Sequence, residues 1–263
     1  MSNSIRNLKI FLLFSKYSIK SLLQERLGIV LFTLGKIIRF AMFFFFIYIL
    51  VAKTSTLKGY TTNQVIIFYL SFNLVDTLSQ LLFREVYRFR ELVVTGELDG
   101  VLIKPYHPFL RVLVGGVDFL DAIFLGPYIA LTVYFISIST GITLTSLFTY
   151  ILLLMNALAI TVGFHIAVLA LGIVTTNVDH SIMIYRDVTS LGRFPIEIYR
   201  EPLRWIFTFL LPVGIMMSFP SQSLFGLLSI QGIISAFVVS TGFITCSLFF
   251  WRYALRKYQS WGG

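Results

Sequence analysis

The chain has 263 residues, of which 57% are hydrophobic and only 13% are charged. Soluble domains are roughly 45–50% apolar and about 25% charged, so this chain has too few charged side chains to cover a water-exposed surface. Its one cysteine, Cys246, excludes a scaffold held together by internal disulfides. The composition therefore predicts an integral membrane protein.

The first predicted element, residues 4–26, is an amphipathic helix. At about 100° per residue, its basic and its aliphatic side chains gather on different arcs, which indicates a helix lying at the membrane surface. The alternative is a solvated basic flank that only fixes topology.

Long apolar runs follow, and they predict an all-α fold. A helix needs about 20 apolar residues to cross a hydrocarbon core about 30 Å thick. We expect one transmembrane domain over residues 1–263, with clear spans at about 30–52, 63–83, 114–137, 147–175 and 225–251.

The stretch before the last span is ambiguous. Residues 205–219 are uncharged, but they are few for a full span and include Pro212. In one interpretation, 180–204 is a cytoplasmic loop and 201–219 is the fifth span.

In the second interpretation, residues 180–198 form a polar fifth span and 203–219 form a re-entrant hairpin on the outer side. A polar helix is tolerated in a membrane when its polar stripe faces a cavity or a partner subunit. The residues of this stripe, which would also line a pathway, are Arg186, Thr189, Ser190 and Arg193.

The net charge of +9 reflects topology. Lys and Arg concentrate in cytoplasmic loops. Five precede the first span, five lie in the loop after the second and three follow the last, whereas the loop after the first span has two. We therefore expect both termini in the cytoplasm, an even number of spans, namely six, and no nucleic-acid partner.

Three charged residues lie deep inside predicted spans. Lys36 and Arg39 in the first span lie at a depth similar to that of Asp76 in the second. Because an unpaired charge at this depth is costly, we predict that Asp76 pairs with Arg39 or Lys36. The alternative is that Asp76 binds a substrate or an ion.

Catalytic motifs are missing from the sequence. His107, His165 and His180 are scattered and lack metal-ligand spacing, and neither GxSxG nor GxxxxGK[ST] occurs. We expect no catalytic residue, no metal and no cofactor in this chain, so it is not an enzyme by itself. Energy for transport would come from an ion gradient or another protein.

The loop at 84–111 is the most informative segment. Gly96 and Gly100 bracket a short charged stretch where a helix can stop and restart, and Pro105 and Pro108 then hold the chain extended. A loop that only connects two spans could be far shorter. Its mixed charges predict a docking surface for a cytoplasmic partner.

Two motifs resemble those of permease subunits of ABC type-2 transporters. Gly96-Glu97-Leu98-Asp99 with residues 102–108 is similar to the signature G-x-L-D-x-x-L-x-[RK]-P-x-x-P, and it is closest to a six-helix branch of about this length. A second match comprises 193–199, 202–204, Leu211-Pro212 and Phe219-Pro220. The resemblance covers nearly the whole chain.

The resemblance implies a permease subunit that forms half of a translocation pathway and is driven by separate ATPase subunits, which bind ATP and Mg²⁺. It also implies a second permease, either a copy of this chain or a related one, a coupling helix in the loop, a multi-pass location in the cytoplasmic membrane, and export. It favours the re-entrant hairpin. The coupling residues it implies are Glu85, Arg88, Glu91, Gly96, Glu97, Leu98, Asp99, Lys104, Pro105 and Pro108.

Two other classes of function are less well supported. An ion-coupled carrier needs several intramembrane carboxylates and broken helices, and this chain has few such carboxylates. A membrane-embedded enzyme or assembly factor would need a cluster of His, Asp or Glu, which the sequence does not suggest.

Overall fold

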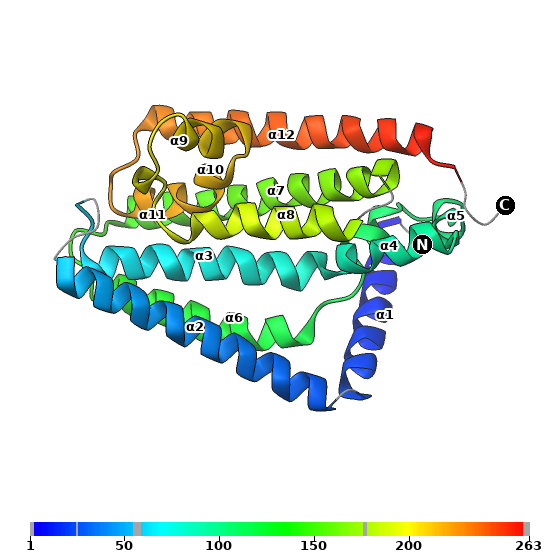
Figure 1. The fold of residues 1–263 in the computed structure, drawn as a ribbon, viewed down its shortest axis with the longest axis horizontal. Coiled ribbons are helices and arrows are strands. Elements are labelled where there is room, and N and C mark those ends of the chain that lie inside the picture. The colour runs from blue at the N-terminus through cyan, green and yellow to red at the C-terminus, as the bar shows by residue number, and fades with distance from the viewer. Residues whose placement is uncertain (1–2, 25, 55–58, 176–177, 260–263) are drawn as a thin grey trace.

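A computed structural model describes residues 3–24, 26–54, 59–175 and 178–259, and the regular elements in these ranges are helices. Five of the helices in the described ranges are long and apolar enough to cross a membrane, which confirms the expectation of an all-α membrane protein. They lie side by side along the long axis of the molecule (Figure 1). Their bounds are Arg26–Thr54 (α2), Thr62–Phe83 (α3), Phe119–Ser137 (α6), Leu144–Thr175 (α7) and Ile230–Lys257 (α12).

Helices α3 and α7 form the interior of the bundle. Most of their apolar residues are buried, whereas α2, α6 and α12 expose most of theirs. Helix α7 packs against α12, and α3 packs against α6. Gly163 of α7 allows the close approach of α12, since a Cβ there would lie 2.9 Å from a ring carbon of Phe243.

Polar caps decide where the long helices begin. The Thr61 hydroxyl accepts from the Gln64 amide, and the Gln64 side chain accepts from the Thr61 amide in return. Asp118 caps α6 because its carboxylate accepts hydrogen bonds from the backbone amides of Leu120 and Asp121. Together with the positive φ of Gly115, this cap starts α6 at 119 rather than at the predicted 114. Ser229 likewise starts α12 at 230 rather than 225.

The N-terminal helix α1 (Asn3–Gln24) lies across one end of the bundle (Figure 1). Its Ser15 hydroxyl accepts from the Val117 amide at 3.3 Å. Gly116 touches the same helix, because a Cβ there would lie 2.6 Å from the Phe14 carbonyl oxygen. Leu8 and Leu12 are exposed, so α1 has an apolar face that does not pack against the rest of the described chain.

The ambiguous stretch contains one helix followed by several short ones. Helix α8 (Val178–Ser190) and its 3₁₀ extension η3 (Leu191–Arg193) run beside α7. The chain then stays at the end of the bundle opposite to α1 (Figure 1). It forms η4 (Ile196–Ile198), α9 (Leu203–Trp205), η5 (Ile206–Leu210), α10 (Val213–Met217) and α11 (Phe219–Leu224).

A single helix over 201–219, the first interpretation, is not formed. Leu211 leaves the helical conformation, and Pro212 has no amide with which to continue a helix. After this break the chain turns inward, and the side chains of α10 and α11 are all buried. The result is a hairpin at this end of the bundle, with α9 and η5 before the break and the buried α10 and α11 after it.

The contact at Gly163 can be tested by overpacking. We expect Gly163→Leu to destabilise the protein by about 1–3 kcal/mol, because the side chain would displace Phe243 and separate α7 from α12. Gly242→Leu on α12 is the matched control, since nothing lies within 4 Å of its Cβ position. Thermal unfolding in detergent measures both variants. Equal midpoints would contradict this account of the α7–α12 contact.

Candidate functional site

The segment after α3 builds one end of the molecule. Helix α3 continues through η1 (Arg84–Arg88) into α4 (Phe89–Val94), and Gly96 at φ 75° then reverses the chain into α5 (Glu97–Leu102). A left-handed conformation of this kind favours glycine. Figure 1 shows that α4 and α5 lie at the same end as the start of α1 and the end of α12.

Apolar side chains anchor this end to the bundle. Leu98 and Phe89 are fully buried, and so are most of their apolar neighbours on α4 and α5. The rings of Phe89 and Phe109 lie 6.3 and 5.1 Å from that of Trp251 on α12. Leu98 of the motif therefore packs in the core and does not face a partner.

Glu85 holds the turns of the segment together. Its carboxylate is only 7% exposed, forms an ion pair with Arg111, and lies 3.7 Å from Arg88 Nη1. Gly115 makes room for it, since a Cβ at Gly115 would lie 2.6 Å from Glu85 Cγ. The Arg111 guanidinium also lies over the Phe14 ring of α1, at 5.6 Å. Glu85 is therefore a positioning residue.

The outward face of this end combines charged and apolar side chains. The coupling candidates that it exposes are Arg88, Glu91, Glu97, Lys104 and Pro105, whereas Gly96, Asp99 and Pro108 are half-buried. Among them lie Val94, which is 49% exposed, and Ile103, which is 84% exposed. Sequence reasoning missed these two because it looked for charge. The sequence signal that could have indicated an exposed position is that Ile103 directly precedes a lysine and a proline.

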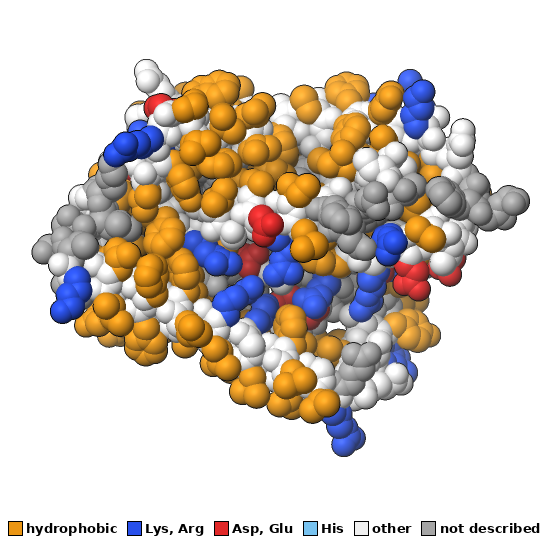
Figure 2. Space-filling model, viewed as in Figure 1, with side chains coloured by type: hydrophobic (Ala, Val, Ile, Leu, Met, Phe, Trp, Pro, Cys, Tyr) orange, Lys and Arg blue, Asp and Glu red, His pale blue; other side chains and the backbone are white. Residues whose placement is uncertain are grey.

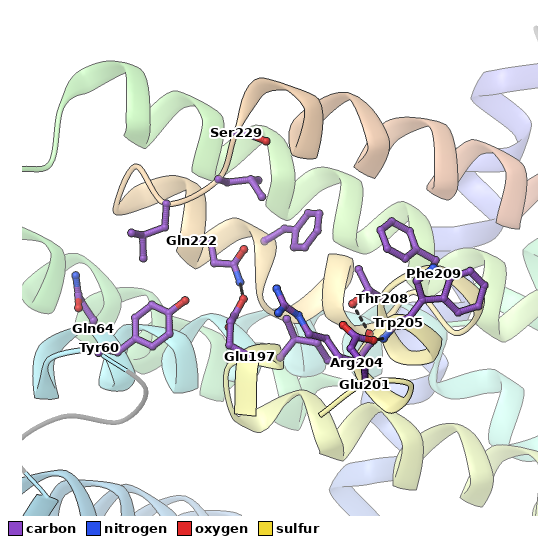
Figure 3. A pocket seen from close by; sticks show the side chains of 15 residues that line it. Tyr60, Gln64, Glu197, Glu201, Arg204, Trp205, Thr208, Phe209, Gln222 and Ser229 are labelled. Carbon is purple, nitrogen blue, oxygen red and sulfur yellow. Dashed lines mark hydrogen bonds between the residues drawn. The ribbon is translucent and has the colours of Figure 1, made fainter. Parts of the chain in front are cut away.

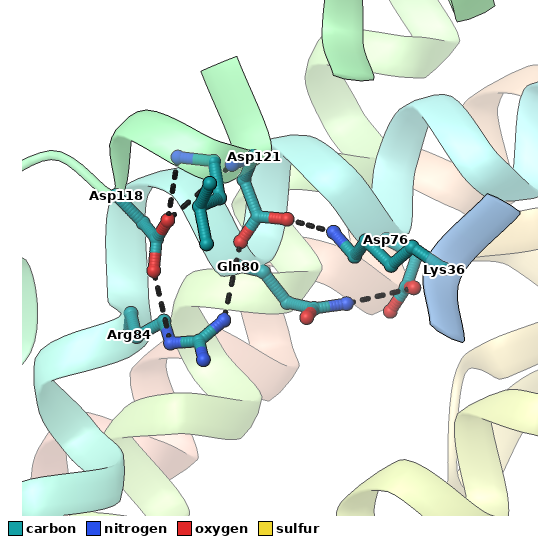
Figure 4. Close-up of polar contacts among 7 residues, drawn as sticks. Lys36, Asp76, Gln80, Arg84, Asp118 and Asp121 are labelled. Atoms are coloured by element: carbon teal, nitrogen blue, oxygen red, sulfur yellow. Dashed lines mark hydrogen bonds and ion pairs between the residues drawn. The ribbon is translucent and has the colours of Figure 1, made fainter. Parts of the chain in front are cut away.

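A network of charges joins α2, α3 and α6 (Figure 4). Lys36 forms an ion pair with Asp121, and both side chains are buried, Asp121 completely. Arg84 Nε lies 3.0 Å from Asp118 Oδ2, and Arg84 Nη1 lies 3.5 Å from Asp121 Oδ2. The two carboxylates of the first turn of α6 thus neutralise Lys36 and Arg84.

This network replaces the predicted pairing of Asp76. No ion pair joins Asp76 to Lys36 or to Arg39, all three being described residues, and Asp76 instead accepts a hydrogen bond from Gln80 at 2.8 Å. The prediction compared only the first two spans. The structure brings the start of α6 against α3, and Asp121 takes the position next to Lys36.

A cleft of about 440 Å³ opens beside this network. It lies between α2, the α3–η1 segment and α8. Its polar lining side chains are Lys36, Arg39, Gln80, Arg84, Tyr87, Arg88 and Arg186. Figure 2 shows Lys and Arg side chains gathered in a hollow in the middle of this face, with some Asp and Glu side chains among them and hydrophobic side chains around them.

The predicted polar stripe on α8 divides between this cleft and the interior. Arg186 lines the cleft, and the guanidinium of Arg193 lies 5.4 and 5.6 Å from the rings of Phe43 and Phe72. Ser190 donates to the Asp187 carbonyl at 2.7 Å, and Thr189 is buried. The two arginines thus face α2 and α3.

A second cavity, of about 740 Å³, lies at the end of the bundle opposite to α4 and α5 (Figure 3). Three pieces of the second sequence motif contribute lining residues to it, namely Ile196 and Glu197, Arg204, and Phe219. Glu197 accepts a hydrogen bond from Gln222, and Glu201 accepts one from the Trp205 amide at 3.1 Å. Burial, and secondly the Glu197 carboxylate, raise the pKa of the Tyr60 hydroxyl, so Tyr60 stays neutral.

Two of the three histidines have described side chains, and these have separate surroundings. His165 is buried, bonds to the Thr161 carbonyl through Nδ1 at 2.8 Å, and packs against Phe83 and Tyr185. His107 is exposed, and the side chain of His180 lies outside the described part of the chain. Among the described residues, no three His, Cys, Asp or Glu side chains gather closely enough to hold a metal ion.

A family model described as "ABC-2 family transporter protein" matches residues 37–262. The chain belongs to the ABC-2 transporter family. The match supports an ABC-2 type permease, and it contains both sequence motifs, the α4–α5 end and the buried hairpin. Neither the curated proteins nor the solved structures include a significant match.

Membership in this family means that the two ends and the cleft belong to a membrane permease. An ABC-2 permease works in a membrane with ABC ATPase subunits. The match begins within α2, so helix α1 lies outside it. The assignment therefore depends on the bundle and its motifs and not on the N-terminal helix.

The buried ion pair of the permease can be tested by removing one partner at a time. We expect Asp121→Ala to destabilise the protein by about 3–5 kcal/mol, because Lys36 would remain buried without a counter-charge. Asp76→Ala should lose only about 1 kcal/mol, the contribution of one hydrogen bond. Unfolding by SDS titration measures both. Similar losses would show that Asp121 is not the main partner of Lys36.

Proposed function

We propose that this permease is one half of an ABC exporter of the cytoplasmic membrane, with α4 and α5 in the cytoplasm. The observation that carries the proposal is the exposed face of α4 and α5, which lies at the same end as both termini of the described bundle. Basic residues gather at this end, including Arg90, Lys104 and Arg256, as the positive-inside rule requires of a cytoplasmic side.

The sixth crossing in this proposal is α8 with η3. Together they run from 178 to 193, which is about 24 Å at 1.5 Å per residue. This length is short for a bilayer, but it suffices where a neighbouring hairpin fills the remaining depth. In this proposal a re-entrant hairpin fulfils that role, formed by α9 and η5 with the buried α10 and α11, because irregular backbone within a membrane has to be covered by protein.

The coupling surface in this proposal is the outward face of α4 and α5. ATP and Mg²⁺ bind in the partner ATPase, since this chain has no phosphate-binding loop. Val94 and Ile103 supply the apolar centre of the contact, and Glu91, Glu97 and Lys104 supply its charged rim. The anchored residues Leu98 and Glu85 make this end stiff, so that it can transmit a movement of the ATPase.

The translocation pathway in this proposal lies between two permease copies, along the face formed by α2, α3 and α8. This is the face on which the cleft opens and on which Arg186 and Arg193 lie. An ion-coupled mechanism has less support, because Asp118 and Asp121 neutralise Arg84 and Lys36. We propose export by analogy with the six-helix branch that the motifs resemble.

The topology can be tested with a single cysteine. In a Cys246→Ser background, Arg200→Cys lies in the exposed turn between η4 and α9, at the end that we assign to the outside. We expect a membrane-impermeant maleimide to label it in intact cells. Lys104→Cys is the matched control and should be labelled only after the cells are opened. Labelling of Arg200→Cys only in opened cells would contradict the re-entrant hairpin.

The coupling surface can be tested with two equally exposed apolar residues. Ile103 and Leu144 are each 84% exposed, but they lie at opposite ends of the bundle. We expect Ile103→Asp to abolish the co-purification of a vanadate-sensitive ATPase with the permease, because a carboxylate would lie in the apolar centre of the contact. Leu144→Asp should retain the ATPase. The reverse pattern would place the coupling surface at the other end.

A further inference from the structure

The cleft beside α2 has a surplus of positive charge. Five of its lining residues, given above, are Lys or Arg, and no carboxylate is among the residues that line it. Lys36 and Arg84 are neutralised by Asp121 and Asp118 (Figure 4), neither of which lines the cleft. Arg88 lies 3.7 Å from Glu85, which it shares with Arg111. These carboxylates neutralise only some of the Lys and Arg side chains that line the cleft.

Arg39 and Arg186 are the remaining cations. Neither forms an ion pair with another residue in the part of the chain that the structure describes. Arg39 lies in the middle of the candidate span Arg26–Val51, where an unpaired charge is most costly. The nearby carboxylate of Asp76 accepts a hydrogen bond from the neutral Gln80 amide and keeps its negative charge. The cations that line the cleft nevertheless outnumber the carboxylates that form ion pairs with them, so the cleft has a surplus of positive charge that suits an anion.

The shape of the cleft also suits a ligand. Its volume of about 440 Å³ lies within the range of about 300–1,000 Å³ that is typical of small-molecule sites. Phe32 and Tyr87 form aromatic walls, and the rings of Phe43 and Phe72 continue the aromatic surface toward Arg193. Hydrophobic side chains surround the hollow in which the cations lie (Figure 2). The cationic floor thus lies next to a hydrophobic border.

We propose that this cleft binds a phosphate-bearing ligand, with Arg39 and Arg186 holding the phosphate group. Guanidinium groups bind phosphate oxygens in pairs of parallel hydrogen bonds, which an ammonium group cannot do. The hydrophobic border accommodates an apolar body attached to that phosphate. A membrane phospholipid and a soluble organic phosphate carry the same chemistry. If the face formed by α2, α3 and α8 is the translocation pathway, the ligand is an anionic cargo. Only the interpretation of the ligand as cargo rests on the proposed function.

Native mass spectrometry of the full-length permease tests the site without an ATPase. The protein in detergent is offered equal amounts of dioleoyl phosphatidic acid and dioleoyl phosphatidylcholine, which differ only in the head group. We expect the first bound lipid to be phosphatidic acid with at least about a tenfold preference, equivalent to about 1.4 kcal/mol. Arg39→Gln with Arg186→Gln should bring the ratio close to one.

The control pair is Arg252→Gln with Arg256→Gln, which removes two exposed arginines of α12 outside the cleft. It should keep the preference of the unmodified protein. Arg39→Lys with Arg186→Lys retains the charge and should lose only part of the preference. Equal binding of the two lipids by the unmodified protein, or an equal loss in the control pair, would overturn the proposal. The lipid preference of the unmodified protein is measured without any variant, so this result does not depend on whether a variant folds.

Added inorganic phosphate distinguishes the two sources of the ligand. Displacement of phosphatidic acid at a similar concentration would support the phosphate site and assign it to a soluble phosphate. Retention of phosphatidic acid would support the site and assign it to an amphiphile. Because this readout uses the permease alone, loss of the site and loss of ATPase coupling are separate results. A permease that binds phosphatidic acid but no ATPase would contradict only the proposed function.

Discussion

Every charge inside an apolar bundle has to be neutralised, and this constraint organises the permease. The buried pair of Lys36 and Asp121 connects α2 to α6, and Arg84 connects α3 to both carboxylates of α6. Helix α2 exposes most of its surface, and aromatic contacts of Phe40 and Phe43 with Tyr69 hold its second half against α3. The ion pairs fix the part of α2 that carries Lys36. A cleft lies between this part of α2 and α8.

The cleft and the α4–α5 end share one structural element. Arg88 lies over Glu85, which anchors the turns leading to α6, and Arg88 also lines the cleft. Helix α3 continues directly into η1 and α4. A displacement of α4 and α5 by a partner would therefore move Arg84 and Arg88 relative to Arg39 and Arg186. This arrangement connects a surface without catalytic groups to a charged site inside the bundle, as a permease driven by another protein requires.

The fold was largely predictable because its signals are local. The five long apolar runs became five long helices, and Gly96 between two short helical segments became a left-handed turn. The starts of α6 and α12 were misplaced because the capping residues Asp118 and Ser229 set them more sharply than apolar composition does. The candidate site was predicted only in part. Its charged residues were visible, but Val94 and Ile103 were missed, since exposure cannot be read from an apolar side chain alone.

By itself, the sequence determined the membrane class, the number of clear apolar runs and the motifs of the family, because composition and spacing along one segment carry that information. Only the tertiary structure decided which charges meet. Lys36 and Asp121 are 85 positions apart, and nothing in either segment selects this pair over Asp76. The choice depends on the packing of α6 against α3. The same packing leaves Arg39 facing an open cleft, where the sequence suggested a simple ion pair.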